Sequence, residues 1–350
     1  MPWQATLIAP GKTVRDAIET IQNSGGQICL VAGDDRVLLG TITDGDVRRG
    51  LLNGLDLDTP VEKVMNKKPH SISPNADPAK VQALMKKDLL RQIPAVDEQG
   101  RVVGLYHIND FESGQISRNN WVVLMAGGLG TRLKPLTEDN PKPLLPVGDK
   151  PILETILEGF IEQNFRKFYI SVNYKAAAIK VHFGNGEKWG VEIRYLEEKT
   201  RLGTAGALQL IPETPDHPLF VMNGDLLTRV NFQDLLEYHL GHDAKATMCV
   251  REYDLQVPFG VVDIKNNRIQ DIDEKPLQRF FINAGIYVLD PDLIGLIPEG
   301  KQFDMTDLFG RAAEEGHSTA AFPIHEYWLD VGRIDDLEQA NLEFDKNFAK

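Results

Sequence analysis

The stretch that most constrains the fold is residues 121–147, where an apolar run stops at glycines and cations follow at once. Residues 121–125 have the length and apolarity of a buried parallel strand. Glycines after such a strand let the backbone turn sharply and bring its N–H groups close to a ligand. Arg132 follows the loop, and Lys142 stands between two prolines that hold it on a stiff segment. The stretch therefore predicts an anion site at the end of a strand.

Two common phosphate-binding loops do not fit this stretch. A dinucleotide fingerprint needs a glycine three positions after Gly130, where Leu133 stands. A Walker loop needs Lys and Ser/Thr directly after its last glycine, but Thr131 and Arg132 follow Gly130. A glycine-rich turn after a strand can also be nothing more than tight packing. The motif Gly-Gly-Leu-Gly-Thr-Arg, with Pro-Lys-Pro-Leu ten residues after the arginine, closely resembles the signature of sugar-1-phosphate nucleotidyltransferases. The resemblance covers about residues 120–350.

Composition limits the remaining function classes. A chain of 350 residues exceeds what one hydrophobic core usually serves, so two domains are expected. The net charge of −13 argues against a nucleic-acid groove, which needs a basic face. The two cysteines, Cys29 and Cys249, are far apart in apolar runs and are expected to be reduced thiols. Without an apolar stretch of about 18 residues, a soluble cytoplasmic protein with no membrane contact is expected.

Residues 1–116 contain an internal repeat. Gly40 and Gly104 stand 64 residues apart, as do Asp46 and Asp110, and each copy predicts helix, strand, turn, strand, helix. The repeat resembles a pair of cystathionine-β-synthase (CBS) domains, with units of about residues 1–64 and 65–116. Such pairs commonly bind adenosine or related nucleotides, and a purely structural, dimerising module is the alternative.

The resemblance to CBS domains implies a regulatory nucleotide site. In that family a hydroxyl residue and an Asp three positions later face phosphate and ribose. Thr43 and Asp46 fit this pattern in the first unit, whereas His107 replaces the hydroxyl residue before Asp110 in the second. One competent cleft is therefore expected.

The rest of the chain predicts an α/β domain over residues 121–350, after a polar linker at 117–120. Strands and helices alternate, which indicates a Rossmann-like doubly wound mixed sheet beside the α+β CBS pair. Ligands are expected where the strands end. Expected strands after the first are residues 168–172, 191–196, 219–222, 247–250 and 320–328, and expected helices are residues 151–164, 204–210, 232–240 and 333–348.

Two aspartates predict a metal site. Asp225 follows the strand at residues 219–222, and Asp330 follows the strand at residues 320–328. Two carboxylates with substrate phosphates suit Mg²⁺. An aspartate at a strand end is also common as a helix cap or turn residue. The nucleotidyltransferase resemblance implies a metal-binding Asp in both places.

The same resemblance implies the remaining site residues. Lys142 would contact the α-phosphoryl group and Arg132 the leaving pyrophosphate. Arg201 stands where pyrimidine-using relatives often have Gln, and its donor fork suits O6 and N7 of guanine, although it could also pair with a phosphate or with surface acids. The nucleotide would lie against Ala126, Gly127, Gly128, Gly130, Thr131, Arg201, Gly203 and Thr204. The sugar phosphate would lie against Gly260, Glu274, Lys275 and Asn283.

The implied reaction joins an NTP and a sugar 1-phosphate to give an NDP-sugar and pyrophosphate. The nucleophile is already an anion at neutral pH, so no general base is needed. GTP with a hexose or hexosamine 1-phosphate is favoured, with UTP or dTTP and glucose 1-phosphate as the alternative. From another class, an inactive nucleotide-sugar sensor remains open, although Arg132, Lys142, Asp225 and Asp330 are all present. A homo-oligomer is expected.

Overall fold

The computed structural model describes residues 3–24, 27–88, 90–108 and 118–348, which divide into two compact units. The first unit is Met1–Gln115 and the second is Ile116–Lys350. Each unit has its own apolar core, which the sequence length predicts.

The first unit confirms the internal repeat. The hairpin β2–β3 pairs Val31 with Gly40, and the hairpin β4–β5 pairs Ala95 with Gly104, each with a register irregularity at the next step. The second helix of the second repeat falls on residues outside the described ranges. The described elements in chain order are η1 (Trp3–Thr6), β1 (Leu7–Ile8), α1 (Val14–Ser24), β2 (Ile28–Ala32), β3 (Leu38–Thr43), α2 (Asp44–Leu52), η2 (Val61–Lys63), α3 (Pro78–Lys87), β4 (Gln92–Val96) and β5 (Val102–His107).

The two repeats contact each other through equivalent atoms. The Leu38 amide donates to the Gly100 carbonyl at 3.0 Å, and the Val102 amide donates to the Arg36 carbonyl at 2.9 Å. Adding the repeat length of 64 to Leu38 gives Val102, and subtracting it from Gly100 gives Arg36. The contacts are therefore related by a pseudo-twofold, as in a pair of CBS domains.

The second unit is built on a seven-stranded mixed sheet with the order β10-β9-β6-β11-β16-β13-β17. The first four strands are parallel, β16 is antiparallel to both its neighbours, and β17 is parallel to β13. Its strands are β6 (Arg118–Met125), β7 (Pro146–Val147), β8 (Lys150–Pro151), β9 (Phe165–Val172), β10 (Glu192–Glu197), β11 (Leu219–Asn223), β12 (Leu226–Thr228), β13 (Ala246–Gln256), β14 (Gly260–Lys265), β15 (Arg268–Glu274), β16 (Leu277–Leu289), β17 (Thr319–Ile324) and β18 (Trp328–Asp330).

Helices cover both faces of this sheet, which confirms the doubly wound fold. Successive residues of β6 point to opposite faces, so Val122 and Leu124 enter one core and Val123 enters the other. The first core packs against α4, α5, α7 and α9, and the second packs against α6 and α8. The helices of the unit are α4 (Ile152–Glu162), α5 (Ala176–Phe183), α6 (Gly203–Gly206), α7 (Phe232–Gly241), α8 (Met305–Glu314) and α9 (Ile334–Phe348), with short 3-10 turns between them.

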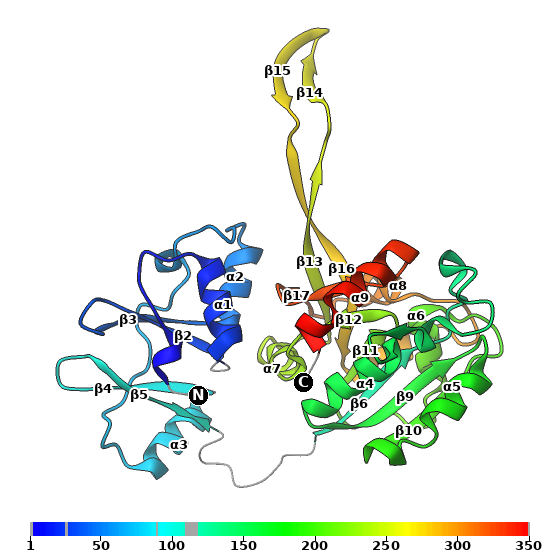
Figure 1. Ribbon diagram of the computed structural model, residues 1–350, viewed down its shortest axis with the longest axis horizontal. Coiled ribbons are helices and arrows are strands. Elements are labelled where there is room, and N and C mark those ends of the chain that lie inside the picture. The colour runs from blue at the N-terminus through cyan, green and yellow to red at the C-terminus, as the bar shows by residue number, and fades with distance from the viewer. Residues whose placement is uncertain (1–2, 25–26, 89, 109–117, 349–350) are drawn as a thin grey trace. The chain divides into compact units, whose positions relative to one another are not determined.

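Beyond the sheet, β13 and β16 continue as a two-stranded ribbon that ends in the hairpin β14–β15 (Figure 1). We call residues 250–283 of this ribbon the arm. The sequence indicated a strand that stops at Val250, but β13 runs to Gln256 because its ladder with β16 continues from Val250–Asn283 to Gln256–Leu277.

Two further expectations from the sequence need correction. Residues 118–120 belong to β6 rather than to a linker, since Arg118 pairs with Phe165 and the Asn120 side chain donates to the Pro218 carbonyl at 2.7 Å. The expected strand at residues 320–328 is two strands, β17 and β18, with a break at residues 325–327. At the break, Arg251 donates to the Glu326 carbonyl at 2.9 Å.

Over the described ranges, every helix is too short or too polar to cross a membrane.

Candidate active site

Lys142 and Asp225 meet at the carboxyl ends of the central strands. Asp225 follows β11 by two residues, and Lys142 begins the 3-10 turn η5 (Lys142–Leu144), directly after Pro141. The Lys142 ammonium donates to the Asp225 carboxylate, and Lys142 is buried. A buried ammonium is stable only when it is paired. The ion pair therefore holds both side chains at this edge of the sheet.

Asp330 lies beside Asp225 because two short strands pair there. β12 and β18 are antiparallel, and Asp330 lies opposite the first residue of β12. The Val331 amide donates to the Asp225 carbonyl at 3.0 Å. The pKa of the Asp330 carboxyl is raised, first by desolvation and then by the negative charge of Asp225, while the charges of Lys142 and Arg132 lower it. Asp330 nevertheless remains accessible to solvent. The structure thus brings together the two carboxylates expected to bind the metal.

Arg132 reaches the same place from the glycine loop. It lies in the 3-10 turn η4 (Thr131–Leu133), and both Thr131 and Arg132 are exposed. A methyl group built on Gly332 would lie 3.6 Å from the Arg132 guanidinium, and the Gly332 amide donates to the Asp330 carbonyl at 2.9 Å. Two cations and two carboxylates, far apart in the chain, therefore share one edge of the sheet.

The glycine loop between β6 and η4 is shaped by close contacts. The buried Ala126 donates its amide to Ser171 at 2.9 Å. Gly130 has a φ of 64°, and a side chain there would collide with Thr137 at 2.8 Å. Gly128 has no neighbour within 4 Å of a built Cβ, so its backbone is open to a ligand.

Glu198 is a side chain at this loop that sequence reasoning did not single out. Its carboxylate accepts from the Ser171 hydroxyl at 2.6 Å and from the Leu202 amide at 3.0 Å. A Cβ on Gly127 would lie 2.8 Å from Glu198 Oε1. Gly127 is therefore required by packing, and Glu198 joins the loop to the segment that carries Arg201. No local sequence pattern marks this contact, since 71 residues separate the two partners.

Asn223 is a second unassigned side chain at the site. It ends β11, two residues before Asp225, and its side-chain Oδ1 is buried without a hydrogen-bond partner in the described structure. The neighbouring Gly285 has a φ of 72°, and a Cβ there would lie 2.7 Å from Asn223 Nδ2. The Asn-Gly-Asp motif at the strand end was the available signal. A buried, unpaired acceptor at a cluster of charges marks a ligand site.

The segment expected at the nucleobase is partly held by α8. Thr204 donates from its amide and its hydroxyl to Asp304 Oδ1, at 2.8 and 3.2 Å. Gly203 has a φ of 81°, and a Cβ there would lie 2.6 Å from the Phe303 carbonyl. These contacts give Gly203 and Thr204 a structural role. Arg201 lies in the preceding loop and is exposed.

The structure separates the residues expected at the sugar phosphate. Asn283 lies at the base of the arm, where its side chain donates to the Tyr287 hydroxyl at 2.8 Å and accepts from the Gly285 amide at 2.9 Å. Gly260 and Glu274 pair with each other in the hairpin β14–β15, and Lys275 follows them. All three are exposed. The hairpin is therefore not placed beside Asn283 in this chain.

The two first-unit residues expected at a regulatory nucleotide are joined to each other. The Thr43 hydroxyl donates to Asp46 Oδ2 at 2.7 Å, and together they form a capping box at the start of α2. Arg49 lies 2.5 Å from the other Asp46 oxygen. Asp110 falls outside the described residues.

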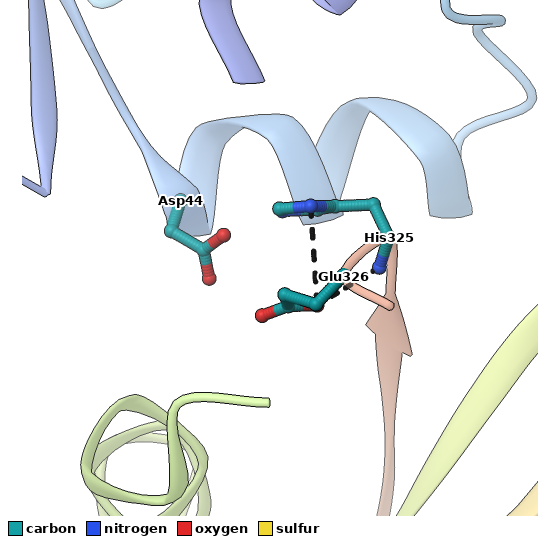
Figure 2. Close-up of side chains that lie close together, drawn as sticks. All are labelled: Asp44, His325 and Glu326. Atoms are coloured by element: carbon teal, nitrogen blue, oxygen red, sulfur yellow. Dashed lines mark hydrogen bonds and ion pairs between the residues drawn. The ribbon is translucent and has the colours of Figure 1, made fainter. Parts of the chain in front are cut away.

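A histidine and a glutamate lie together after β17. The side chains of His325 and Glu326 approach to 3.9 Å, and the His325 amide donates to the Glu326 carboxylate at 3.0 Å (Figure 2). Asp44, labelled in the same picture, belongs to the first unit, where Arg48 lies 2.5 Å from its carboxylate. Within the second unit, His325 and Glu326 offer two ligand atoms to a metal. Asp225 and Asp330 instead lie beside Arg132 and Lys142, the two cations expected to contact the phosphates.

Comparison with family models places two kinds of domain in the chain. Residues 121–347 match the model described as nucleotidyl transferase. Residues 4–53 and 61–113 each match the CBS domain model. The matches fall on the second unit and on the two repeats of the first unit, respectively.

Individual relatives resemble the second unit. A mannose-1-phosphate guanyltransferase of Pichia angusta is 34% identical over 225 residues, which cover 61% of each chain. A UTP–glucose-1-phosphate uridylyltransferase of Synechocystis is 32% identical over 238 residues. The solved structure of HddC from Yersinia pseudotuberculosis with GMP-PN has a TM-score of 0.51 and 27% identity, and covers 64% of this chain and 99% of HddC. The match spans about three fifths of the length of the curated relatives.

Proposed function

Because the chain belongs to the nucleotidyl transferase family, we propose that it joins an NTP to a sugar 1-phosphate, releasing pyrophosphate. The observation that carries the proposal is the convergence of Arg132, Lys142, Asp225 and Asp330 at the carboxyl edge of the sheet, next to an open glycine loop. Ligands of doubly wound sheets bind at this edge. The relatives named above use two different nucleotides, so family membership alone leaves the NTP open.

The bond changes follow from the chemistry of the substrates. A phosphate oxygen of the sugar 1-phosphate attacks the α-phosphorus of the NTP, and the bond from this phosphorus to the pyrophosphate oxygen breaks. Lys142 neutralises the α-phosphoryl oxygens, and Arg132 neutralises the leaving pyrophosphate. The acceleration arises from positioning and from fixed charge placed where negative charge builds up. No side chain has to remove a proton.

The carboxylates of Asp225 and Asp330 fit a Mg²⁺ ion. Their charges lie close enough for Asp225 to raise the pKa of Asp330, and carboxylate oxygens are the protein ligands that Mg²⁺ prefers. When bound, Mg²⁺ supplies positive charge to the triphosphate. Asp225 and Asp330 would hold the ion, and Lys142 partners the Asp225 carboxylate.

GTP is the proposed nucleotide. Arg201 is exposed in the loop after β10, and its fork of donors suits the paired acceptors of guanine. Mannose-1-phosphate guanyltransferases among the relatives favour the same choice. A hexose or hexosamine 1-phosphate is the matching acceptor.

The test is a matrix of the five common NTPs against glucose, mannose and glucosamine 1-phosphates, with pyrophosphate release as the readout. The expected result is Mg²⁺-dependent release that is largest with GTP. Lys142→Ala serves as the catalytic control, and Lys199→Ala, which alters a lysine two residues from Arg201, serves as the surface control. Absence of release in every combination would overturn the proposal, and a maximum with UTP or dTTP would overturn the choice of GTP.

We also infer that the first CBS repeat binds a regulatory nucleotide and that residues 118–350 suffice for the reaction. The residues assigned to catalysis all lie in the second unit. Thr43 and Asp46 offer the hydroxyl and the carboxylate that a phosphate and a ribose need, although both now cap α2. Such a nucleotide alters turnover only if it binds two arrangements of the chain unequally, with typical couplings of about 1–3 kcal/mol.

Calorimetric titration of the full chain with AMP, ATP, GMP and GTP tests this site. Because Asp46→Ala also breaks the capping box that Asp46 forms with the N-cap residue Thr43, Asp46→Asn is the cleaner variant. Asp16→Asn, at the equivalent cap of α1, is the matched control for stability, since Asp16 accepts from the Thr13 amide at 2.8 Å. Binding that survives Asp46→Asn undiminished would leave the repeat as a structural module.

A further inference from the structure

The outer hairpin of the arm has one apolar face and one polar face. In the register of β14 and β15, Val262 lies opposite Ile272 and Ile264 lies opposite Ile269. Residues directly opposite each other share a face, so these four apolar side chains form one stripe. They are 41, 65, 63 and 56% exposed for Val262, Ile264, Ile269 and Ile272. The other face carries Asp263 opposite Asp271, and it is polar over most of its length.

The inner part of the arm is divided less sharply, since Leu277 and Phe281 are also exposed on the face that carries Arg279. Tyr253 lies opposite Phe280 and Leu255 follows two residues later on the same face, and all three are about half exposed. On the opposite face, Arg279 pairs with Glu252 at 2.7 Å and with Asp254 at 2.9 Å. Each section of the ribbon therefore carries an apolar face that no described residue of the second unit covers.

A ribbon of this kind needs a covering partner. An isolated two-stranded ribbon is marginal in water, and monomers rarely expose apolar patches above a few hundred Å². With about half of each of the seven apolar side chains exposed, the two faces offer about 600 Å² of apolar surface, on the scale of 150–250 Å² for a large side chain. Two copies that each cover the arm of the other would remove about 1,200 Å² of arm surface from water, which is the lower bound of a standard interface.

The positions of the residues expected at the sugar phosphate indicate which partner covers the arm. Lys275 is eight residues from Asn283 along an extended strand, which separates them by about 25 Å at ~3.3 Å per residue. The one irregularity in this ladder lies between Met248 and Val250, where the ribbon leaves the sheet, and the ladder is regular from Val250 to Gln256, so Lys275 is held far from Asn283 of its own chain. The arm of one copy can instead bring Gly260, Glu274 and Lys275 to the sheet edge of another.

We propose that the chain forms a twofold dimer in which the arm of each copy covers the other and completes its sugar-phosphate pocket. The proposal rests on the proposed function, because it uses the same pocket. Twofold pairing matches this geometry because each copy supplies one arm and one sheet edge. Glu274 lies on the apolar face of the hairpin, opposite Gly260, where a Cβ would lie 2.8 Å from the Glu274 carboxylate. Covering this face therefore carries Glu274 into the interface.

Complementation between two damaged chains tests the proposal. Asp225→Asn, altered in the sheet edge, and Lys275→Ala, altered in the arm, are co-expressed with different tags, and the doubly tagged dimer is purified. In the proposed dimer one of the two sites has an intact edge and an intact arm, so about half of the parental turnover is expected. If each arm serves its own chain, both sites are damaged and no activity returns.

The linked arrangement reverses both outcomes. A chain with Asp225→Asn and Lys275→Ala together is paired with a parental chain. The proposed dimer then has no intact site, whereas an arm that serves its own chain leaves one site active. A parental dimer with both tags is the positive control, and its inactivity would count against the proposed function instead. Parental turnover in the Lys275→Ala homodimer, or failure of the two tags to purify together, would overturn the arm's role.

Charge placed on the arm should remove the rescue. Ile269→Glu, introduced into the chain that carries Asp225→Asn, puts a carboxylate on the apolar face of its intact arm, and at least a tenfold loss of the restored turnover is expected. Val181→Glu, on α5 where Val181 is 86% exposed, is the matched control and should leave the rescue intact. Equal turnover in the two variants would show that the apolar face is not covered.

Discussion

The sheet edge and the arm differ in how far their expected substrate-binding residues are exposed to solvent. At the edge, Lys142 is buried against Asp225, and closely packed glycines surround the pair. On the arm, the residues expected at the same substrate are exposed beside an uncovered apolar face. The edge is organised by its own chain, whereas the arm is organised only when something covers it. The difference locates catalysis in one copy and, in our proposal, part of substrate recognition in another.

The largest expected effect is at the edge. Asp225→Asn and Asp330→Asn each remove a metal-ligand charge with little change in volume, and each should lower turnover by about 10²-fold or more. Asp330→Asn should keep the circular dichroism and the unfolding midpoint of the parent. Asp225→Asn should keep the circular dichroism but lower the unfolding midpoint, because it leaves the buried Lys142 ammonium without its charged partner. Asp335→Asn, on the exposed start of α9, is the matched control. Near-parental turnover at saturating Mg²⁺ would remove the altered residue from the metal site.

The next expected effect separates base recognition from sugar recognition. Arg201→Gln exchanges two donors for one donor and one acceptor, so the ratio of kcat/KM for GTP over UTP should fall by an amount equivalent to about 1–3 kcal/mol. Glu274→Gln, on the arm, should leave this ratio unchanged and alter the preference among sugar 1-phosphates. The comparison fails if Arg201→Gln leaves the ratio unmoved or if Glu274→Gln shifts it.

Some features of the sheet edge could be predicted from the sequence. The strand at residues 121–125 and the aspartate at 225 follow simple rules, since a buried parallel strand is an apolar run and its ligands lie just past its end. Asp330 lies beside Asp225 although its expected strand was misplaced, because β18 pairs with β12 directly after Asp225. Local pattern predicted the position of a residue at the sheet edge where that residue directly follows its strand in the chain.

The features that the sequence did not reveal depend on residues far apart in the chain or on a partner that the local pattern does not identify. Glu198 reaches the glycine loop across 71 residues. The arm's apolar residues alternate as they do in any half-buried strand, so their pattern predicts a covered face without saying what covers it. A strand's length depends on the continuity of its partner's ladder, which explains why β13 extends six residues beyond Val250.

A smaller effect tests the packing of β13 where this strand belongs to the seven-stranded sheet. His239 on α7 is buried against the Thr247 hydroxyl at 2.9 Å, and desolvation lowers its pKa to about 4 from an ordinary 6.5. As pH falls, His239 of the unfolded chain is therefore protonated before His239 of the folded chain. The contribution of this histidine to the free energy of unfolding is fully present above pH 6.5 and is lost as pH falls towards 4. About 1.5 kcal/mol should be lost by pH 5.5 from this group.

Urea unfolding of the parent and of His239→Gln at pH 7.5 and 5.5 measures this loss. Tryptophan fluorescence follows the second unit, which contains Trp121, Trp189 and Trp328 of the four tryptophans. The pH dependence should be smaller in His239→Gln and parental in His242→Gln, where the altered histidine is exposed at the end of the same helix. An undiminished pH dependence in His239→Gln would mean that the buried imidazole does not carry it.

The smallest expected effect lies on the polar face of the arm, where Asp263 stands directly opposite Asp271. Like charges in directly opposite positions destabilise a ladder, so Asp263→Lys should stabilise the hairpin by about 0.2–1 kcal/mol. Hydrogen exchange of peptides from residues 260–274 measures the gain, and exchange in β6 and β11 should not change because the hairpin opens as a separate unit. Asp273→Lys is the comparison variant, since Asp273 lies opposite Val261 and only diagonal to Asp263, so a smaller gain is expected. If protection rises equally in β6, the arm and the body open together, and the contrast between an edge organised within its chain and an independently opening arm fails.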